Sequence, residues 1–586
     1  MTEWGVHNFG ASLLVNKSYD LDVNKLLFVD VETDEKDGFV GIGYMQEPSR
    51  VYFSSNLYTL SRQISTYLNQ GGKLVGHNLK FDAKLLVKWG VDVKPEHLQD
   101  DTILMSYTIN ATKESHSLKD LGKELGYEWP TYSEMVHPDP DHKHKKVTLD
   151  AQDVHTVANY CAMDVLVTYK LYEKFIKQMD LNQRRVYQQI EMPLMRILFE
   201  MELQGVLVDV EKLQHLGNEF SKRLNSLTES LRAVSGCPTL NPNSNKQIAE
   251  ILEGRGITLE TTQKGNKKVD KFTLEKHQED DLVKTLIEYN KLEKLVSTYT
   301  GGLLKRETLP KVYTTYNQVT GSGRGSSETG ISTGRLSSSN PNLQQIPTRT
   351  EEGKLLRELF IGLPGHVLID ADYSQIEYRL LAHFTKEPVL LEAFRTGQDV
   401  HEATGKIIGC DRDMGKKINF SVIYGAGAEK IAQSLNRPVG EAEQILKKYW
   451  SKLPSVTAWI TRVKHEATKK GGVFTLMKRW IPIDGFDSRN KYDRWGAERK
   501  AVNYLIQGSA AEIIKMAMIQ LKSMSNFLPL LTVHDELLFE SDGANTEEVE
   551  CHAAVIKSIM EDVVKLDVPL VADVGIGNNW REAKGD

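Results

Sequence analysis

The sequence predicts a multidomain α/β protein, and three observations support this class. The chain has 586 residues, more than one hydrophobic core accommodates, which suggests about three or four lobes. Apolar β-type runs that end in acidic residues are followed by helical spacing, most clearly in residues 366–381. Amphipathic, charge-rich helical patterns fill residues 210–300 and 380–500. The predicted architecture is therefore a set of strands that carry acidic residues at their ends, surrounded by helical lobes.

Composition limits the class of protein and its compartment. Hydrophobic residues make up 40% and charged residues 26% of the chain, which is ordinary for a soluble globular enzyme. No apolar run approaches the ~18 residues of a membrane helix. The four cysteines form no CxxC pair, which argues against a disulfide framework or a zinc site. The first ten residues carry no export or import signal, so a reducing, cytoplasmic location is expected.

The net charge constrains how the chain could bind nucleic acid. Its formal value is −6, which is unusual for a protein that coats nucleic acid with its whole surface. Any contact with DNA would therefore come from local basic clefts beside acidic metal sites.

The first lobe contains three acidic patterns in order. A strand over 25–34 carries an acid-x-acid pair on one face, because strand side chains alternate. A strand that ends at 76–78 leads into a helix with an acid in an early turn, and a later helix has Tyr and Asp four residues apart. Each pattern alone is ordinary, but the ordered set predicts two bound divalent ions and a tyrosine that orients the water attacking a phosphodiester. The residues are Asp30, Glu32, Asp82, Asp164 and Tyr160.

A polar loop at 131–146 contains His137, His142 and His144, which are potential metal ligands. Its prolines and lysines favour a solvated, irregular segment over a metal site.

Residues 185–220 predict a domain junction, with a short strand at 206–208 and Asp209 as the cap of the next helix. The lobe that follows is predicted to be elongated and helical. Its polar turn at 243–246 suits phosphate oxygens, and it equally suits an ordinary helix N-terminus capped by Ser or Asn. The two interpretations stay open on the residues alone.

A strand is predicted over 311–319, and a flexible, glycine-rich loop over 321–334. The turn-rich segment that follows offers hydrogen-bond donors with little apolar content. These donors are Arg335, Asn342 and Gln344.

The stretch from His366 to Leu380 reads as a buried strand that delivers Asp372 to a strand-to-helix junction. Far downstream, residues 529–541 predict a β-hairpin with His534, Asp535 and Glu536 at its bend. Two carboxylates from separate strands suit hard divalent cations, and two such ions can activate a 3′-hydroxyl and stabilise a leaving pyrophosphate. The pair therefore predicts a nucleotidyl-transfer centre.

Two helices supply candidate binding stripes. On the helix at 411–427, two cations precede two aromatics at four-residue intervals. This order matches a nucleoside triphosphate, which has phosphates at one end and sugar and base at the other. The alternative is an ordinary amphipathic helix with surface cations and core aromatics. The helix at 497–518 carries donors that could check base-pair geometry in the minor groove, or simply face solvent. The stripes are Arg412, Lys416, Phe420 and Tyr424 on the first helix, and Arg499, Asn503 and Gln507 on the second.

With these residues established, the chain resembles the family A DNA polymerases, of the bacterial DNA polymerase I large-fragment type and its phage relatives. The ordered acids of the first lobe resemble the 3′-5′ exonuclease domains attached to such polymerases. The similarity runs from about Leu26 to Trp580. Its most specific strings are DYSQIE at 372–377, the helix stripe that ends in Tyr424-Gly425, and VHDE at 533–536.

The resemblance implies an RNase H-like 3′-5′ exonuclease domain at 1–185, followed by a right-hand polymerase domain at 186–586. Within the latter it implies a palm at 186–209, 311–378 and 497–586, a thumb at 210–310, and fingers at 379–496.

The resemblance also implies residue roles. Asp372 and Asp535, with Tyr373, would hold the polymerase metal ions, and Lys416 would give a proton to pyrophosphate. Glu377 would oppose a ribose 2′-hydroxyl, and Phe420 would choose between deoxy and dideoxy sugars. The implied dNTP-binding set is Arg412, Lys416, Phe420, Tyr424, Glu377, Gln375 and Tyr373. The implied DNA-binding set is Arg335, Asn342, Gln344, Arg499, Asn503, Gln507 and His534.

The expected activity is DNA-templated DNA synthesis with 3′-5′ proofreading, using Mg²⁺, two ions per active site, with Mn²⁺ as an alternative. The expected partners are primer-template DNA and dNTPs, without a membrane, for a monomer. No 5′-nuclease domain precedes the exonuclease pattern, and the 321–329 segment looks added relative to the family. These features favour phage genome replication in a host cytoplasm, with bacterial repair as the alternative. A chain that acts mainly as a 3′-5′ exonuclease, and a DNA-binding scaffold, are the competing classes.

Overall fold

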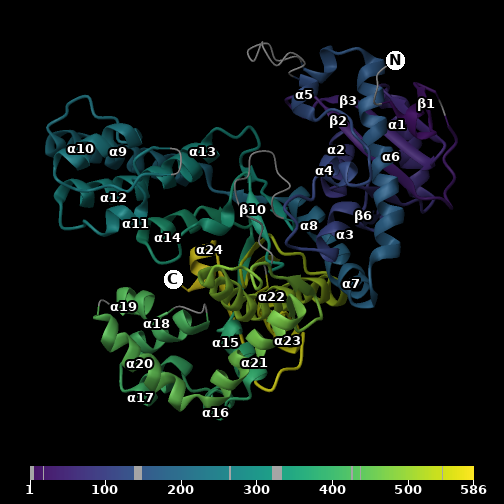
Figure 1. Cartoon of the computed structure of the whole chain (residues 1–586). Helices are drawn as coiled ribbons and strands as arrows, with labels where there is room; N and C mark the ends of the chain where they lie inside the picture. The colour runs from purple at the N-terminus through teal and green to yellow at the C-terminus, as the bar shows by residue number, and fades with distance from the viewer. Residues whose placement is uncertain are drawn as a thin grey trace.

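The computed structural model describes residues 5–17, 19–136, 148–262, 265–319, 333–423, 427–435, 437–543 and 545–585. The histidine loop around His142, the 321–329 segment and Tyr424 therefore lie outside the described residues. Figure 1 shows an N-terminal lobe at the right and two helical lobes at the left, one above and one below the C-terminus.

The N-terminal lobe is built on a six-stranded mixed sheet with the order β1-β4-β3-β2-β5-β6. Because β2 and β5 run parallel, their carboxyl ends meet at the same edge of the sheet. The acids of β2 and the helix that follows β5 therefore lie together, as the sequence predicts. The strands are β1 (Ser12–Val15), β2 (Leu27–Thr33), β3 (Phe39–Glu47), β4 (Arg50–Ser54), β5 (Leu74–Gly76) and β6 (Leu98–Asp101).

Helices cover this sheet, and the longest of them, α6, packs against β2, β3 and β4. Tyr160 and Asp164 both lie on α6, which confirms their helical spacing. The helices of the lobe are α1 (Leu57–Asn69), α2 (Leu79–Lys88), α3 (Thr102–Ile109), α4 (Leu118–Lys123), α5 (Tyr132–Val136) and α6 (Val154–Gln178).

The helix α8 (Met192–Gln204) joins the N-terminal lobe to the rest of the molecule. It follows α7 (Leu181–Val186) and the π-helical turn η4 (Tyr187–Glu191). Met195 and Phe199 pack into the core of the N-terminal lobe, whereas Leu194 and Ile197 pack into the core around the central sheet. One amphipathic helix therefore belongs to two cores, which ties the lobes together.

A buried charge cluster reinforces this junction. Glu191 in η4 pairs with Arg479, and its Oε1 lies 2.7 Å from Lys515 Nζ. Arg479 Nε also donates to Glu512 Oε1 at 3.1 Å. All four side chains are at most 2% exposed, so each charge depends on its partners for compensation.

The predicted strand at 206–208 and the predicted Asp209 cap are both confirmed, since the Asp209 side chain accepts from Lys212 N. In the polar turn at 243–246, the Ser244 side chain accepts a hydrogen bond from Gln247 N. This hydrogen bond supports the interpretation of the turn as a helix cap. The lobe over 210–304 contains α9 (Val210–Ser235), α10 (Asn245–Gly254), α11 (Lys271–Glu275), α12 (Asp281–Leu295), the π-helical turn η5 (Val296–Thr300) and α13 (Gly301–Leu304).

The single strand predicted over 311–319 is wrong. The structure has two short strands, β8 (Lys311–Val312) and β9 (Thr315–Asn317), in different sheets. β8 pairs with β7 (Val206–Val208), which also pairs with β11 (Phe360–Ile361), and β9 pairs with β10 (Ser337–Ser339). Thr314 between them bonds Ser338 Oγ at 2.7 Å and Pro341 O at 2.8 Å, so its polar side chain is satisfied where the chain changes sheet.

The central sheet is four-stranded, with the order β15-β16-β12-β17. It places the strand of Asp372 beside the predicted hairpin, which is confirmed. The strands are β12 (His366–Tyr373), β15 (Leu531–Val533), β16 (Glu536–Asp542) and β17 (Ala572–Gly577). The helices around it are α14 (Glu351–Arg357), α15 (Ile376–Thr385), α22 (Lys491–Ser525), α23 (Thr546–Asp562) and α24 (Trp580–Lys584).

Residues 388–482 form the lower helical lobe, which agrees with the helical pattern predicted there. α22 begins at Lys491, so the boundary predicted at 497 falls inside a helix. The elements are α16 (Pro388–Arg395), α17 (Val400–Ile408), α18 (Arg412–Ile423), α19 (Ala428–Leu435), α20 (Val439–Lys452), α21 (Pro454–Lys470), β13 (Gly472–Phe474) and β14 (Trp480–Pro482).

Candidate functional site

The central sheet brings Asp372 and Asp535 together. Asp372 pairs in register with Glu536 across the β12–β16 ladder, and Tyr373 N donates to Asp535 O at 3.1 Å. Asp535 follows His534, whose φ of 58° gives the tight turn between β15 and β16. A carboxylate at the end of one strand therefore lies next to a carboxylate at the adjacent hairpin turn.

Burial and mutual repulsion act on both carboxylates. Burial raises the pKa of Asp372 to about 6, with a further contribution from the charge of Asp535. Burial also raises the pKa of Asp535. Two half-buried acids that repel each other gain stability when a cation lies between them.

Two further acids and a lysine extend this cluster. Asp370 precedes Asp372 by two residues, so both side chains lie on one face of β12. Burial, together with Glu536, raises the pKa of Asp370 to about 9. Lys584 Nζ lies 2.8 Å from Asp372 Oδ2, 3.1 Å from Glu536 Oε2 and 3.4 Å from Asp370 Oδ1. The strand alternation could have revealed Asp370, but no local pattern predicts the contact with Lys584.

Glu536 is held on its other side as well. Its Oε1 accepts from Arg357 Nη1 at 3.0 Å and from Trp580 Nε1 at 2.5 Å. Although burial opposes ionisation, a hydrogen bond with Asp370 and the charges of Arg357 and Lys584 lower the pKa of Glu536. Glu536 is thus ionised and fixed from both sides.

The carboxylate oxygens of the central sheet fit a divalent cation. Asp372 Oδ1 is buried and has no hydrogen-bond partner among the described residues. Carboxylate oxygens are the ligands that Mg²⁺ prefers, and an unpartnered buried oxygen is available for an ion. The Tyr373 side chain is buried, and its hydroxyl donates to Met560 O at 2.6 Å. The Tyr373 side chain therefore faces the core and not a nucleotide, which leaves its backbone carbonyl as the group able to face an ion.

Several predicted binding residues surround this centre. Arg335, Gln344, His534 and Asp535 line one small cavity. Arg335 Nη2 lies 2.5 Å from Glu377 Oε1, so the glutamate is held by an ion pair. Gln344 Nε2 donates to Thr532 O at 3.0 Å, and Asn342 Oδ1 accepts from Gln344 N at 3.1 Å. Their contacts within the protein support the turn beside β15.

The donor row on α22 leads toward the same cavity. Arg499 is exposed, while Asn503 and Gln507 are half-buried. One helical turn beyond Gln507, Ala511 lines the cavity that Asp535 also lines. The row therefore runs along the helix face that ends at the carboxylates.

For the two cations of the α18 stripe, whose side chains are described, no contact with Asp372 is found. Arg412 Nη2 lies 2.7 Å from Asp399 Oδ2 and is half-exposed, and Lys416 is half-buried. Phe420 lies on α18, but its side chain is outside the described part of the chain. Gln375 immediately precedes α15 with a φ of 55°, and its buried Oε1 has no hydrogen-bond partner among the described residues.

A second acidic centre lies in the N-terminal lobe. Asp30 and Glu32 come from β2, and Asp82 Oδ1 on α2 accepts from Val31 N at 3.2 Å. Asp164 and Tyr160 come from α6, and both are nearly buried. The pKa of Asp30 and of Glu32 is raised well above the usual range by burial and by the neighbouring acids. The structure therefore unites the acids that three separate patterns predict.

Lys119 on α4 belongs to this second centre and was not predicted. Its Nζ lies 2.6 Å from Asp164 Oδ1 and 4.1 Å from the ring centroids of both Trp129 and Tyr160. Trp129 Nε1 donates to the same Asp164 oxygen at 2.6 Å. Lysines are common on helix surfaces, so the sequence carries no signal for this position.

Comparisons with known proteins identify the family. Residues 210–582 match the family model described as DNA polymerase family A, and residues 29–180 match the model described as 3′-5′ exonuclease. The chain belongs to DNA polymerase family A. As the resemblance implied, this family A chain pairs an exonuclease-type lobe with a polymerase domain.

Individual relatives agree with this assignment. The family A chain is 33% identical to DNA polymerase I of Synechocystis sp., over 95% of its own length and 59% of the relative. It is 36% identical to DNA polymerase I of Bacillus subtilis, over 86% of its own length and 58% of the relative. It thus spans a little under three fifths of these relatives. Both are bacterial proteins, so they agree with the bacterial alternative and give no support to a phage origin.

A solved structure has the same fold. The POL domain of Pol1 from M. smegmatis, in complex with DNA primer-template and dNTP, superposes with a TM-score of 0.80 at 27% identity. The match covers 95% of this chain and 96% of that one. Among the described helices, none is both long and apolar enough to cross a bilayer.

Proposed function

We propose that this family A chain is a DNA-templated DNA polymerase that adds dNTPs to a primer 3′-hydroxyl and removes 3′-terminal nucleotides at a second centre. The observation that carries the proposal is the pair of half-buried carboxylates, Asp372 at the end of β12 and Asp535 in the adjacent turn between β15 and β16. The M. smegmatis relative was solved with DNA primer-template and dNTP, which are the partners proposed for this chain.

Asp372 and Asp535 would hold Mg²⁺, two ions per centre, with Mn²⁺ as an alternative and the Tyr373 carbonyl as a further ligand. When bound, such ions lower the pKa of the attacking hydroxyl and stabilise charge on the leaving oxygens. The primer 3′-oxygen attacks the α-phosphate, the bond to the β-phosphate breaks, and pyrophosphate leaves. Lys416 donates the proton that pyrophosphate takes up, and Arg412 binds its phosphates.

The residues around the carboxylates orient the substrates. Glu377, held by Arg335, blocks the space of a ribose 2′-hydroxyl, and Gln375, Phe420 and Tyr424 complete the nucleotide site. The donor row of α22 contacts the minor groove of the primer-template, where acceptors are similar for every correct pair. The remaining DNA contacts proposed are Arg335, Asn342, Gln344 and His534.

In the N-terminal lobe, Asp30, Glu32, Asp82 and Asp164 would hold divalent ions for hydrolysis of the terminal phosphodiester. Tyr160 orients the attacking water through its hydroxyl. Lys119 favours the ionised form of Asp164 through their contact at 2.6 Å, against the effect of burial. We propose further that the protein acts as a monomer in the cytoplasm.

The relatives support one proposal for the biological setting. Two matched relatives are bacterial DNA polymerase I proteins, which favours a repair-type bacterial role over phage genome replication. A chain that acts mainly as an exonuclease remains the competing function.

Extension of a labelled primer on a longer DNA template tests the proposal, with Mg²⁺ and with or without dNTPs. The parent lengthens the primer with dNTPs and shortens it without them. Asp535→Asn loses extension by at least about 100-fold, because even residues that only support a metal ligand are worth about 10–100-fold. The matched variant Asp30→Ala/Glu32→Ala keeps extension and loses shortening. Parent-like extension by Asp535→Asn contradicts the proposal, and shortening in both conditions supports the nuclease alternative.

A further inference from the structure

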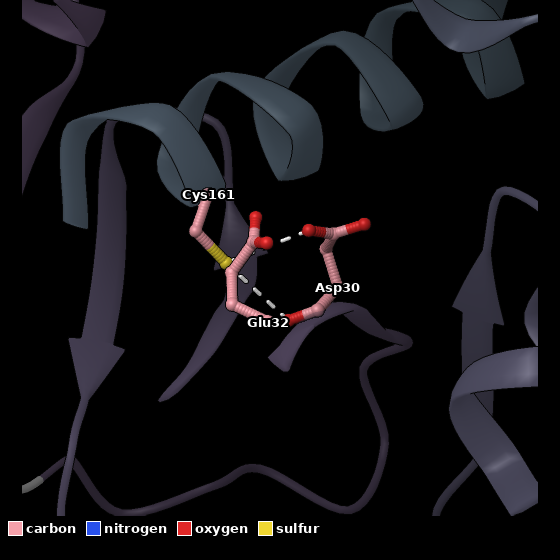
Figure 2. A group of neighbouring side chains, drawn as sticks. All are labelled: Asp30, Glu32 and Cys161. Atoms are coloured by element: carbon pink, nitrogen blue, oxygen red, sulfur yellow. Dashed lines mark hydrogen bonds between the residues drawn. The ribbon is translucent and has the colours of Figure 1, made fainter. Parts of the chain in front are cut away.

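Cys161 lies against the acids of the N-terminal centre. Figure 2 shows its side chain reaching from α6 toward β2, where Asp30 and Glu32 point into the same space. Each of the three residues offers one ligand atom, and these atoms all lie within 4.8 Å of one another. Cys161 immediately follows Tyr160, so the helix that positions the proposed water-orienting tyrosine also positions a thiol.

The separations suit one tetrahedral ion. Cys161 Sγ donates a hydrogen bond to Asp30 Oδ2, with 3.5 Å between the two atoms. A zinc ion with a Zn–S bond of about 2.3 Å and a Zn–O bond of about 2.0 Å, at a tetrahedral angle, places sulfur and oxygen about 3.5 Å apart. The observed pair therefore already has the spacing that a shared ion requires.

The sulfur has polar backbone partners on both strands, β2 and β3, although burial and the neighbouring acids raise the pKa of the Cys161 thiol well above its usual range. Gly43 N donates to Cys161 Sγ at 3.1 Å, and the side chain is fully buried. A backbone N–H aimed at sulfur stabilises negative charge there and orients the ligand. A Cβ at position 43 would lie 2.9 Å from this sulfur, so the glycine allows the close approach of strand β3.

We propose that Cys161 is a third protein ligand, with Asp30 and Glu32, for a borderline or soft divalent ion such as Zn²⁺ in the N-terminal centre. The inference rests on the proposed function, which assigns the two carboxylates to metal binding, and it adds a thiol that favours different ions. Binding breaks the S–H bond, forms a sulfur–metal bond and releases one proton to solvent, with no change of oxidation state.

The chemistry separates this ion from Mg²⁺. Thiolate ligands select Zn²⁺ and other soft ions, whereas Mg²⁺ prefers oxygen and keeps several waters. The same centre thus offers oxygen ligands for Mg²⁺ and a mixed sulfur and oxygen set for Zn²⁺. Zinc is expected to compete with Mg²⁺ at Asp30 and Glu32.

Cadmium titration of the full chain tests the inference, because a sulfur–cadmium bond gives an ultraviolet charge-transfer band that carboxylates do not give. The test chain carries serine at the three other cysteines, Cys237, Cys410 and Cys551, which are at least partly exposed. We expect a band that saturates at one Cd²⁺ per chain and that Zn²⁺ abolishes. The band disappears in Cys161→Ala and in Cys161→Ser, and Zn²⁺ affinity falls at least about 10-fold. Asp30→Asn, which keeps the thiol, weakens Cd²⁺ binding.

The thermal midpoint of each variant shows whether it is folded. Cys161→Ala and Cys161→Ser are both used, so that a packing defect in one of them does not decide the result. No band in the test chain, or an unchanged band in a folded Cys161→Ala chain, overturns the inference. If the chain shortens primers with Mg²⁺ but shows no cadmium band, the zinc site is overturned and the exonuclease proposal stands. A band that depends on Cys161 and Asp30 in a chain that never shortens primers supports the ion site and contradicts the exonuclease proposal instead.

Discussion

Lys584 Nζ lies 2.8 Å from Asp372 Oδ2, so the C-terminal helix α24 places a cation on a carboxylate that β12 delivers. The same amine contacts Glu536 and Asp370, and these acids raise the pKa of Lys584 against the effect of burial. One lysine therefore contacts three acids of the central sheet.

Lys584→Met should lower the free energy of unfolding at pH 7. Removing one partner of a buried ion pair costs about 3–5 kcal/mol, and the 18% exposure of the Lys584 side chain places the loss near the lower end. Urea unfolding measures it. Lys557→Met is the matched control, because Lys557 is half-exposed and lies 3.9 Å from Glu561. Equal, small losses in the two variants would show that Lys584 compensates nothing.

Glu191→Gln should destabilise the lobe junction in a pH-dependent way. Burial opposes ionisation, but Lys515 and Arg479 hold the pKa of Glu191 at about 2, below the ~4.3 of an unfolded glutamate. Stability from this group is therefore present above pH ~4.3 and is lost as the pH falls toward 2. The substitution should lower the free energy of unfolding by about 3 kcal/mol at pH 7 and by less at pH 3.

Thermal midpoints of parent and variant between pH 3 and 7 measure this dependence. Glu200→Gln is the control on α8, since Glu200 forms a partly exposed pair with Lys522 at 3.1 Å and should contribute less than about 1 kcal/mol. A gap between parent and Glu191→Gln that stays constant with pH would contradict the assignment.

Glu377→Ala should let the polymerase centre accept ribonucleotides. Glu377 is 8% exposed and is fixed by Arg335, so its removal opens space where a 2′-hydroxyl would lie. A change of this size in a shaped pocket alters discrimination by about 10–200-fold. The ratio of kcat/KM for dNTP and rNTP measures it. Arg335→Ala, which frees Glu377 without removing it, should give a smaller change, and an unaltered ratio in Glu377→Ala would exclude the steric role.

Lys119→Met should raise the Mg²⁺ concentration that primer shortening requires, while extension is unchanged. Lys119 lowers the pKa of Asp164, of Asp30 and of Glu32 against the larger effect of burial. Without it the acids hold protons to higher pH, so Mg²⁺ must displace them, and the requirement should relax as the pH rises. Magnesium titrations of shortening at pH 7 and 9 measure this. Lys123→Met, one turn along α4 and exposed, should behave like the parent.

Much of the fold follows from local patterns. The alternation of β2 places Asp30 and Glu32 on one face, and the helical period of α6 places Tyr160 and Asp164 together, because these spacings depend only on backbone geometry. The hairpin at 531–542 likewise follows from apolar runs around a polar bend. The prediction over 311–319 failed because pairing partners, and not the apolar pattern, end a strand at Val312.

The sequence by itself determined the family, the order of the lobes and the strands and helices that carry the candidate acids. Only the tertiary structure decided which groups meet those acids: Lys584 on Asp372, Lys119 on Asp164, and Cys161 on Asp30. It also turned the Tyr373 side chain into the core. Local periodicity sets the direction of a side chain from its own backbone, whereas contacts between distant residues depend on how whole elements pack, which no single stretch of sequence specifies.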